Sequence, residues 1–222
     1  IENSYYAEVI GNISHHNTGG ILVFDLPNLP QQGGHDILVK NNKVINNDTA
    51  NFAPEGNIVG KTPNGTGIMI MANDKVKVED NLISGNATAG ILVVSYLEDY
   101  EDDNYNPLPN RIFINNNTLN NNGFNVDEVR AEPISAFTEE KAPEIIWDGV
   151  TTITEWIGFK KQQRLILGPN NSETGSTDMI NLNLMTYALI PWLHKTKNDY
   201  EDYTGKGITL DRVEFETTWQ KN

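Results

Sequence analysis

The densest group of chemically active side chains lies in residues 97–110, which read Leu-Glu-Asp-Tyr-Glu-Asp-Asp-Asn-Tyr-Asn-Pro-Leu-Pro-Asn. Carboxylates and amides are the oxygen ligands that Ca²⁺ prefers, although the spacing differs from that of an EF-hand loop. The carboxylates available to such an ion are Glu98, Asp99, Glu101, Asp102 and Asp103. An acidic loop surrounded by water explains the same composition, so both readings stay open. Tyr100 and Tyr105 could either stack on sugar rings or pin the loop to the body.

Three cations and one aromatic ring form a second candidate site. Lys75 and Lys77 occupy the start and the third position of one repeated strand, and Arg111 and Phe113 occupy the same positions of a later strand. If these strands are neighbours, the four side chains form a small basic and aromatic patch that fits a carboxylated sugar. Solvated surface charges explain the patch equally well.

The histidines do not form a recognisable site. His15, His16, His35 and His194 show no metal-ligand spacing, and His15 would act as a base only beside a carboxylate from another segment. We therefore expect structural or solvent-facing roles for them. No Ser elbow, phosphate loop or dinucleotide fingerprint occurs. The chain has no Cys, which excludes disulfides, thiolate metal sites and a Cys nucleophile.

The net charge of −14 and the pI near 4.6 set up a field that repels phosphate backbones, so nucleic acid is not expected as a partner. An acidic polysaccharide would need a bridging cation or a local basic patch. No stretch approaches the roughly 18 consecutive apolar residues of a membrane span. Because the sequence opens at Ile1 without Met or a signal peptide, we expect a processed chain or a fragment that lacks a leader or upstream coils.

The elements that must position these side chains are found through an internal repeat. Four segments share one frame: alternating apolar residues, then Asn, a short apolar step, and a second Asn five residues after the first. They begin at residues 7, 37, 76 and 112. In three of the four, a Gly-Ile-x-apolar strand follows, at residues 20–23, 67–70 and 90–93. The frame predicts three short strands per coil, separated by fixed turns.

One coil cannot bury its few inward apolar side chains alone, so the coils must stack into a solenoid. Alternation predicts two inward columns, Val9, Val39, Val78 and Ile114 in one, and Ile21, Ile68 and Ile91 in the other. Asn at a repeated turn position tolerates left-handed backbone and bonds to its equivalent in the next coil. We therefore predict two structural Asn ladders, Asn12, Asn42, Asn81 and Asn117 in one, and Asn17, Asn47, Asn86 and Asn122 in the other.

This frame resembles the right-handed parallel β-helix proteins of the pectate-lyase-like superfamily, with their carbohydrate-binding and sugar-hydrolase type repeats. The resemblance covers a little over half the chain. It implies an all-β fold and a secreted, periplasmic or cell-surface bacterial protein. Residues 144–150 also resemble a segment of uncharacterised bacterial envelope β-helix proteins, some associated with c-type cytochromes, although those tails often contain Cys and this one has none.

The repeat ends near residue 125, so we expect coils over residues 1–125 and an irregular cap and tail over residues 126–222. Residues 179–184 alternate cleanly and are expected to add a last rung or to pair with an edge. Trp219 is a candidate anchor of the tail. Insertions at residues 25–35, 48–66 and 97–110 leave the coils, and the first and third leave the same edge, where they could wall a cleft together.

Catalytic groups of this superfamily usually stand outward on a strand beside such loops. Here the outward residues Leu22, Met69 and Leu92 form an apolar stripe, which we expect loops, the tail or a partner to cover. The sequence therefore favours a secreted or envelope protein that binds polysaccharide or a protein partner without turnover. The alternatives are a polysaccharide lyase or C5-epimerase acting on an acidic polysaccharide, either Ca²⁺-dependent or without a cofactor, and a structural subunit of a bacterial envelope complex.

Overall fold

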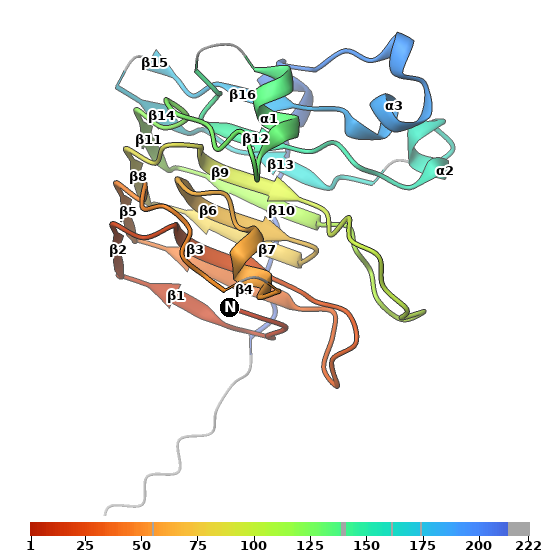
Figure 1. Ribbon diagram of the computed structural model, residues 1–222, viewed down its shortest axis with the longest axis horizontal. Coiled ribbons are helices and arrows are strands. Elements are labelled where there is room, and N and C mark those ends of the chain that lie inside the picture. Colours follow the sequence, from red (N-terminus) through yellow and green to blue (C-terminus); the bar gives the residue numbers. More distant parts are fainter. Residues whose placement is uncertain (55, 139–140, 161, 174, 213–222) are drawn as a thin grey trace, which may run out of the picture.

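The computed structural model describes residues 1–54, 56–138, 141–160, 162–173 and 175–212. Trp219, the expected anchor of the tail, lies outside these residues. Three β-sheets wrap around one long core, and successive turns of the chain stack on each other (Figure 1). The predicted all-β solenoid with three strands per coil is therefore confirmed, as a parallel β-helix.

Each sheet collects one strand from every coil. The first sheet contains β3 (Gly19–Phe24), β6 (Thr66–Met71), β9 (Ala89–Val94), β12 (Ile145–Trp147) and β16 (Met179–Asn181). The second contains β1 (Glu8–Ile10), β4 (His35–Lys40), β7 (Asp74–Glu79), β10 (Asn110–Asn115) and β13 (Leu165–Leu167). The third contains β2 (Ile13–His15), β5 (Lys43–Ile45), β8 (Leu82–Ser84), β11 (Thr118–Asn120), β14 (Asn171–Ser172) and β15 (Gly175–Ser176). All neighbours are parallel except β14 and β15.

The core consists of the inward columns that alternation predicts. Val9 pairs with Val39, Val39 with Val78, and Val78 with Ile114. In the first sheet, Ile21, Ile68 and Ile91 form the second column, and Ile145 continues it. These β-branched side chains suit a pleated, fully buried surface. The side chains of this column from β6, β9 and β12 are completely buried.

The sheets continue beyond residue 125, where we expected the coils to end. The strands β12 and β16 extend the first sheet, β13 extends the second, and β14 extends the third. Residues 179–184 thus contribute the last rung, through β16. The Asn-containing repeat does not extend to these strands, because loops separate them and most of their turns lack the repeated Asn.

Both rows of predicted Asn residues form ladders through the turns. Asn42 donates from its backbone N–H and from Nδ2 to Oδ1 of Asn81, and Asn81 donates to Asn117 in the same way, over 2.9–3.0 Å. Asn170 continues this ladder by one rung. The second ladder ends on the buried carboxylate of Glu144, which accepts from Nδ2 of Asn122. Every rung therefore pairs polar groups that would otherwise be buried without partners.

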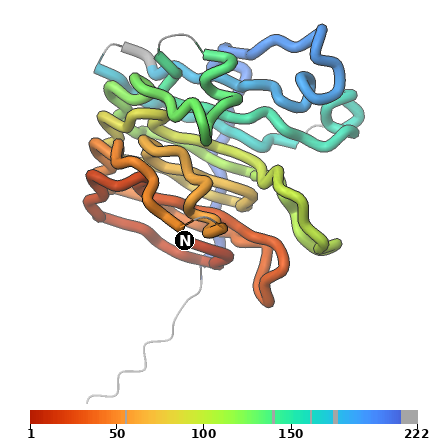
Figure 2. The backbone as a smooth tube through the Cα atoms, viewed as in Figure 1, coloured from red at the N-terminus to blue at the C-terminus, as the bar shows by residue number. Residues whose placement is uncertain are grey.

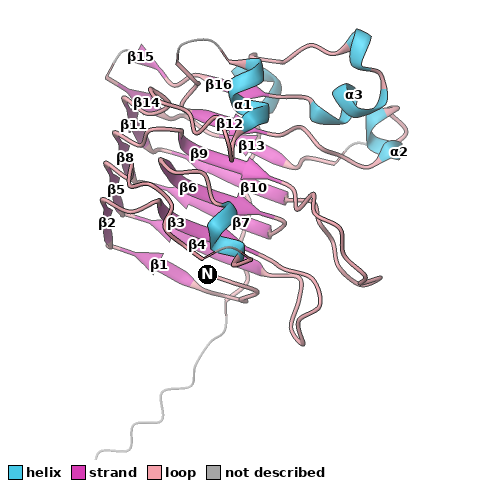
Figure 3. Ribbon diagram, in the orientation of Figure 1, coloured by secondary structure: helices cyan, strands magenta, loops and turns pink. Residues whose placement is uncertain are grey.

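Short helices gather at the C-terminal end of the solenoid, apart from one single-turn helix, Ile58–Lys61, beside the first sheet (Figure 3). They are α1 (Glu132–Phe137), α2 (Ile153–Trp156) and α3 (Leu184–Leu189), with the single-turn helices Pro191–Leu193 and Tyr200–Tyr203. Tyr200 donates its hydroxyl to the carbonyl of Gly168, and Nδ2 of Asn170 donates to the same hydroxyl. This segment thereby covers the end of the first Asn ladder.

Candidate functional site

The outer face of the first sheet carries the apolar stripe expected from the sequence. Leu22, Met69 and Leu92 lie side by side on β3, β6 and β9. Met69 and Leu92 are buried in an apolar cluster that also contains Ile134 of α1 and Leu182. Segments that follow the repeat therefore cover one end of the stripe. Leu22, at the other end, is only half-buried.

Beside the covered end of the stripe, the outer face of the first sheet forms a groove with a volume of about 230 Å³. Leu22, Met71 and Val94 form part of its apolar floor. Its walls come from residues 58–63, 95–98 and 130–134. These loops precede β6, follow β9 and lead into α1, so three separate insertions enclose one stretch of the sheet.

Asp148, which directly follows β12, contributes a carboxylate to the groove lining. It is 2% exposed, and its Oδ2 accepts a hydrogen bond from the backbone N–H of Ser95 over 2.6 Å, while Oδ1 accepts one from Val150 over 3.0 Å. Burial raises the pKa of Asp148 to about 6, and these two backbone donors oppose the rise. Because both oxygens are bonded to the backbone, the geometry favours a structural role over proton transfer.

The rim of the groove is polar. Lys61 Nζ lies 2.8 Å from Glu98 Oε2, which joins two of the walls through an exposed ion pair. Arg130 donates from Nε to the carbonyl of Gly60 over 2.9 Å and so ties the third wall to the first. Asp127 accepts hydrogen bonds from the backbone N–H groups of Asn64 and Arg130. The walls are therefore cross-linked by side chains that lie far apart in the sequence.

The acidic loop at residues 97–110 lies against the loop at residues 25–35, and both project from the same side of the solenoid (Figure 2). Asp102 Oδ2 accepts from the backbone N–H of Asn28 over 2.8 Å and also from Nε2 of Gln32. The buried hydroxyl of Tyr105 donates to the carbonyl of Asp25 over 2.7 Å. Asp102 and Tyr105 thus join the two loops to each other.

The expected Ca²⁺ ligands do not converge on one point. Glu98 pairs with Lys61 and Asp102 binds the neighbouring loop, while Tyr100 packs edge-on against Tyr105 with ring centroids 5.0 Å apart. Among the residues that the structure describes, no group of three or more His, Asp or Glu side chains is arranged to hold a metal ion. Glu98 and Asp102 are therefore engaged by other groups of the chain.

The histidines are dispersed over the molecule. His15, at the end of β2, and His16 contact each other through their Nδ1 atoms over 2.6 Å, and both side chains are exposed. His35 Nδ1 lies 2.6 Å from Asp36 Oδ2, and His194 Nε2 lies 2.8 Å from the carbonyl of Leu182. His35 also stacks on Tyr5, with ring centroids 4.5 Å apart.

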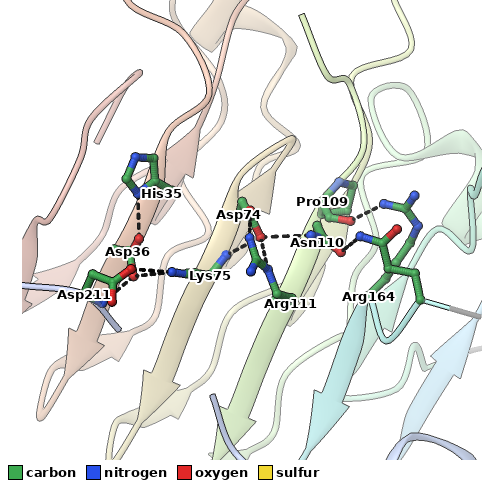
Figure 4. A network of polar contacts seen from close by, with 10 residues as sticks. His35, Asp36, Asp74, Lys75, Pro109, Asn110, Arg111, Arg164 and Asp211 are labelled. Atoms are coloured by element: carbon green, nitrogen blue, oxygen red, sulfur yellow. Dashed lines mark hydrogen bonds and ion pairs between the residues drawn. The ribbon is translucent and has the colours of Figure 1, made fainter. Parts of the chain in front are cut away.

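The second sheet brings the four residues of the predicted basic patch onto the neighbouring strands β7 and β10. Figure 4 shows two of them, Lys75 and Arg111, each paired with a carboxylate. Arg111 binds Asp74 through Nε and Nη2. Lys75 Nζ lies 2.6 Å from Asp211 Oδ2.

The other half of this patch has its own partners. Lys77 Nζ lies 3.2 Å from Glu79 Oε2 and 5.9 Å from the ring centroid of Phe113, which is buried. All three cations of the patch therefore have a carboxylate partner within the chain.

The floor of the groove can be predicted from the sequence, but its walls cannot. The outward alternation of Leu22, Met69 and Leu92 identified the floor. Lys61, Arg130 and Asp148 lie outside the repeated frame, and nothing in their local sequence shows that they meet. Only the lengths of the insertions, which collect on one face of a solenoid, pointed to this region.

In a comparison with known protein families, the family model described as a right handed beta helix region matches residues 1–101. No curated protein and no solved structure matches significantly. Within the described residues, no helix is long and apolar enough to cross a membrane. The match spans less than half of the chain; together with the stacked parallel sheets, it shows that the chain has the fold of a right-handed parallel β-helix.

Proposed function

We propose that this protein is a non-catalytic binding module, and that the groove on the first sheet holds apolar side chains of a protein partner. The observation that carries the proposal is the groove itself: an apolar floor of outward strand residues, enclosed by three cross-linked loops. Surfaces of this kind mark sites of association in soluble proteins.

The volume and the lining of the groove favour an apolar side chain of a peptide over a sugar as its occupant. The volume of about 230 Å³ is below the roughly 300–1,000 Å³ of sites for drug-sized molecules, so it suits one or two side chains. The floor includes Met69 and Met71, whose flexible thioethers adapt to different apolar partners. Sugars are usually held by exposed aromatic faces and dense hydrogen bonding. The aromatic residue of the floor, Phe24, is buried, and Tyr96 belongs to a wall of the groove.

The polar groups of the groove favour binding without turnover. Asp148 is bonded to backbone N–H groups through both oxygens, and Glu98 is paired with Lys61. A lyase or epimerase would need an acid and a base that both face the bound polymer. Among the described residues that line the groove, the structure provides no such pair of unengaged side chains.

A peptide selection tests the proposal. Twelve-residue peptides displayed on phage are selected on the immobilised protein, and the affinity of the selected peptides is then measured by calorimetry for the wild type and two variants. Met71→Gln places an amide in the floor and should weaken binding by about tenfold or more, since burying an unpaired amide costs about 1–3 kcal/mol. Val129→Gln changes an exposed apolar residue that does not line the groove and should leave the affinity unchanged.

Two results would contradict the proposal. Equal affinity for the wild type and Met71→Gln would place the peptide site elsewhere. Release of an unsaturated, ultraviolet-absorbing product from pectin or alginate, abolished by chelator, would make the protein a Ca²⁺-dependent lyase.

A further inference from the structure

Residues 204–212 form a strap that crosses the outer face of the second sheet from the C-terminal to the N-terminal end of the solenoid (Figure 1). It starts with Thr204 paired to Leu167 of β13. It ends with Arg212 Nη2 lying 3.3 Å from Glu8 Oε1 on β1. Between these points it passes over β10, β7 and β4, so one short segment touches all five strands of the sheet.

The first half of the strap is held in place because its backbone packs closely against the second sheet. Gly205 and Gly207 lie against side chains of β13 and β10: a Cβ atom at Gly207 would lie 3.0 Å from Cε1 of Phe113. The strap therefore covers the ring of Phe113, the aromatic member of the basic patch. Only a residue without a side chain fits here unless the ring moves.

The second half of the strap is held in place by contacts with charged side chains of the second sheet. The carboxylate of Asp211 contacts Lys75 Nζ over 2.6 Å, and the backbone N–H of Asp211 donates to Asp36 Oδ1 over 2.6 Å (Figure 4). Lys75 holds the pKa of the Asp211 carboxyl below its usual range. Asp211 thus occupies the place that the carboxylate of an incoming ligand would take beside Lys75.

The strap is held by weak and separable contacts. Beyond Thr204, none of its described residues belongs to a strand, and only Ile208 and Leu210 are half-buried. Ion pairs with an exposed partner are each worth about 0.2–1 kcal/mol, whereas the strands below it are held by continuous hydrogen-bond ladders. The strap can therefore leave the sheet without disturbing the coils.

We propose that the strap is an internal ligand, and that the patch beneath it, Lys75, Lys77, Arg111 and Phe113, binds an extended peptide segment of a partner that places one carboxylate on Lys75, as the strap does, and displaces the strap. The occupant seen in the structure is itself an extended peptide: it presents a carboxylate to Lys75, a backbone N–H to Asp36 and a bare Cα to Phe113. The proposal is independent of the groove, since the patch lies on a different sheet.

Zero-length cross-linking tests this in the full chain. The probe is a peptide with the sequence of residues 205–212, biotinylated at its N-terminus, amidated at its C-terminus and carrying Arg in place of Lys206, so that its Asp is its one carboxylate and it has no amine. A water-soluble carbodiimide joins carboxylates to amines. In the wild type, Lys75 should link mainly to Asp211 of its own chain. In Asp211→Asn, the peptide should link to Lys75 about fivefold more than to the exposed Lys43, as expected for one ion pair of this kind.

Two controls separate displacement of the strap from loss of its charge. Gly207→Val keeps every charge but pushes the strap away from Phe113, and it should also increase linkage of the peptide to Lys75. A probe that carries Asn in place of its Asp should not link in either variant. Circular dichroism establishes that both variants keep the sheets.

Three results would overturn the proposal. Equal linkage of the peptide to Lys75 and Lys43 would mean that the patch has no preference for it. Linkage of a galacturonate hexamer to Lys75 without linkage of the peptide would make the patch a carbohydrate site. Loss of stability in both variants without capture of the peptide would make the strap a structural brace only.

Discussion

Asp148 should make the stability of this protein fall as the pH rises from about 4 to 7. Its pKa is raised by burial from the ordinary value of 3.8 to about 6. Between these values the folded state binds a proton that the unfolded state has released, so stability decreases with rising pH. A difference of about two pKa units corresponds to about 3 kcal/mol, which is lost across this window.

Asp148→Asn isolates this effect because an amide does not titrate here. Asn Oδ1 can accept from Ser95 or from Val150, but Nδ2 then faces the other donor, which adds a pH-independent cost of about 1–3 kcal/mol. The stability of the wild type minus that of the variant should therefore fall by about 3 kcal/mol between pH 4 and pH 7. Carboxyl groups with lowered pKa, such as Glu79 and Glu155, contribute in the opposite direction, but equally in both proteins.

The assay is urea unfolding followed by circular dichroism at steps of one pH unit. Asp103→Asn, a change of an exposed carboxylate in the acidic loop, serves as the control and should show no comparable trend. If the difference between the wild type and Asp148→Asn stays constant from pH 4 to pH 7, the carboxyl titrates normally. In that case the reasoning from burial is refuted.

Three further predictions concern the coils and can be checked by the same unfolding assay. Asn81→Ala removes a central ladder rung and leaves buried donors and acceptors of both neighbouring coils unpaired, so it should destabilise the protein by about 3–5 kcal/mol. Gly67→Ala would place a Cβ 2.4 Å from the carbonyl oxygen of Gly90 and should cost about 1–3 kcal/mol. Arg164→Met leaves the carboxylate of Glu155 buried without its ion pair and should cost about 3–5 kcal/mol.

Each of these changes has a matched control. Asn12→Ala alters the exposed first rung of the same ladder and should cost less than about 1.5 kcal/mol. Gly60→Ala meets its nearest atom at an ordinary contact distance of 3.4 Å and should be tolerated. Adding Glu155→Gln to Arg164→Met should restore part of the loss. Equal costs for Asn81→Ala and Asn12→Ala would show that the ladder does not depend on burial.

The fold could be predicted because its signals are local and periodic. The apolar alternation and the Asn positions recur every 30–39 residues from coil to coil, and each coil can only be stable beside the next. The strands β12 and β13 were not predicted from the repeat because their coils lack most of the repeated Asn residues, whereas the alternation of residues 179–184 predicted β16. In the coils of β12 and β13, Glu144 and Asn170 complete the ladders instead.

The sites were only partly predictable. The stripe of Leu22, Met69 and Leu92 was visible from alternation, whereas the walls of the groove were not. The repeated frame predicted the basic patch around Lys75. It did not predict that the strap covers this patch, because Asp211 lies 136 residues away from Lys75.

The sequence by itself determined the solenoid, its two Asn ladders, the inward columns and the outward stripe, because these depend on periodic choices within each coil. Only the tertiary structure decided that three insertions enclose one groove, that Asp102 and Tyr105 join two loops, and that the strap lies on the basic patch. The physical reason is that these contacts join aperiodic segments. Their partners are selected by the shape and charge of the finished solenoid and not by any spacing along the chain.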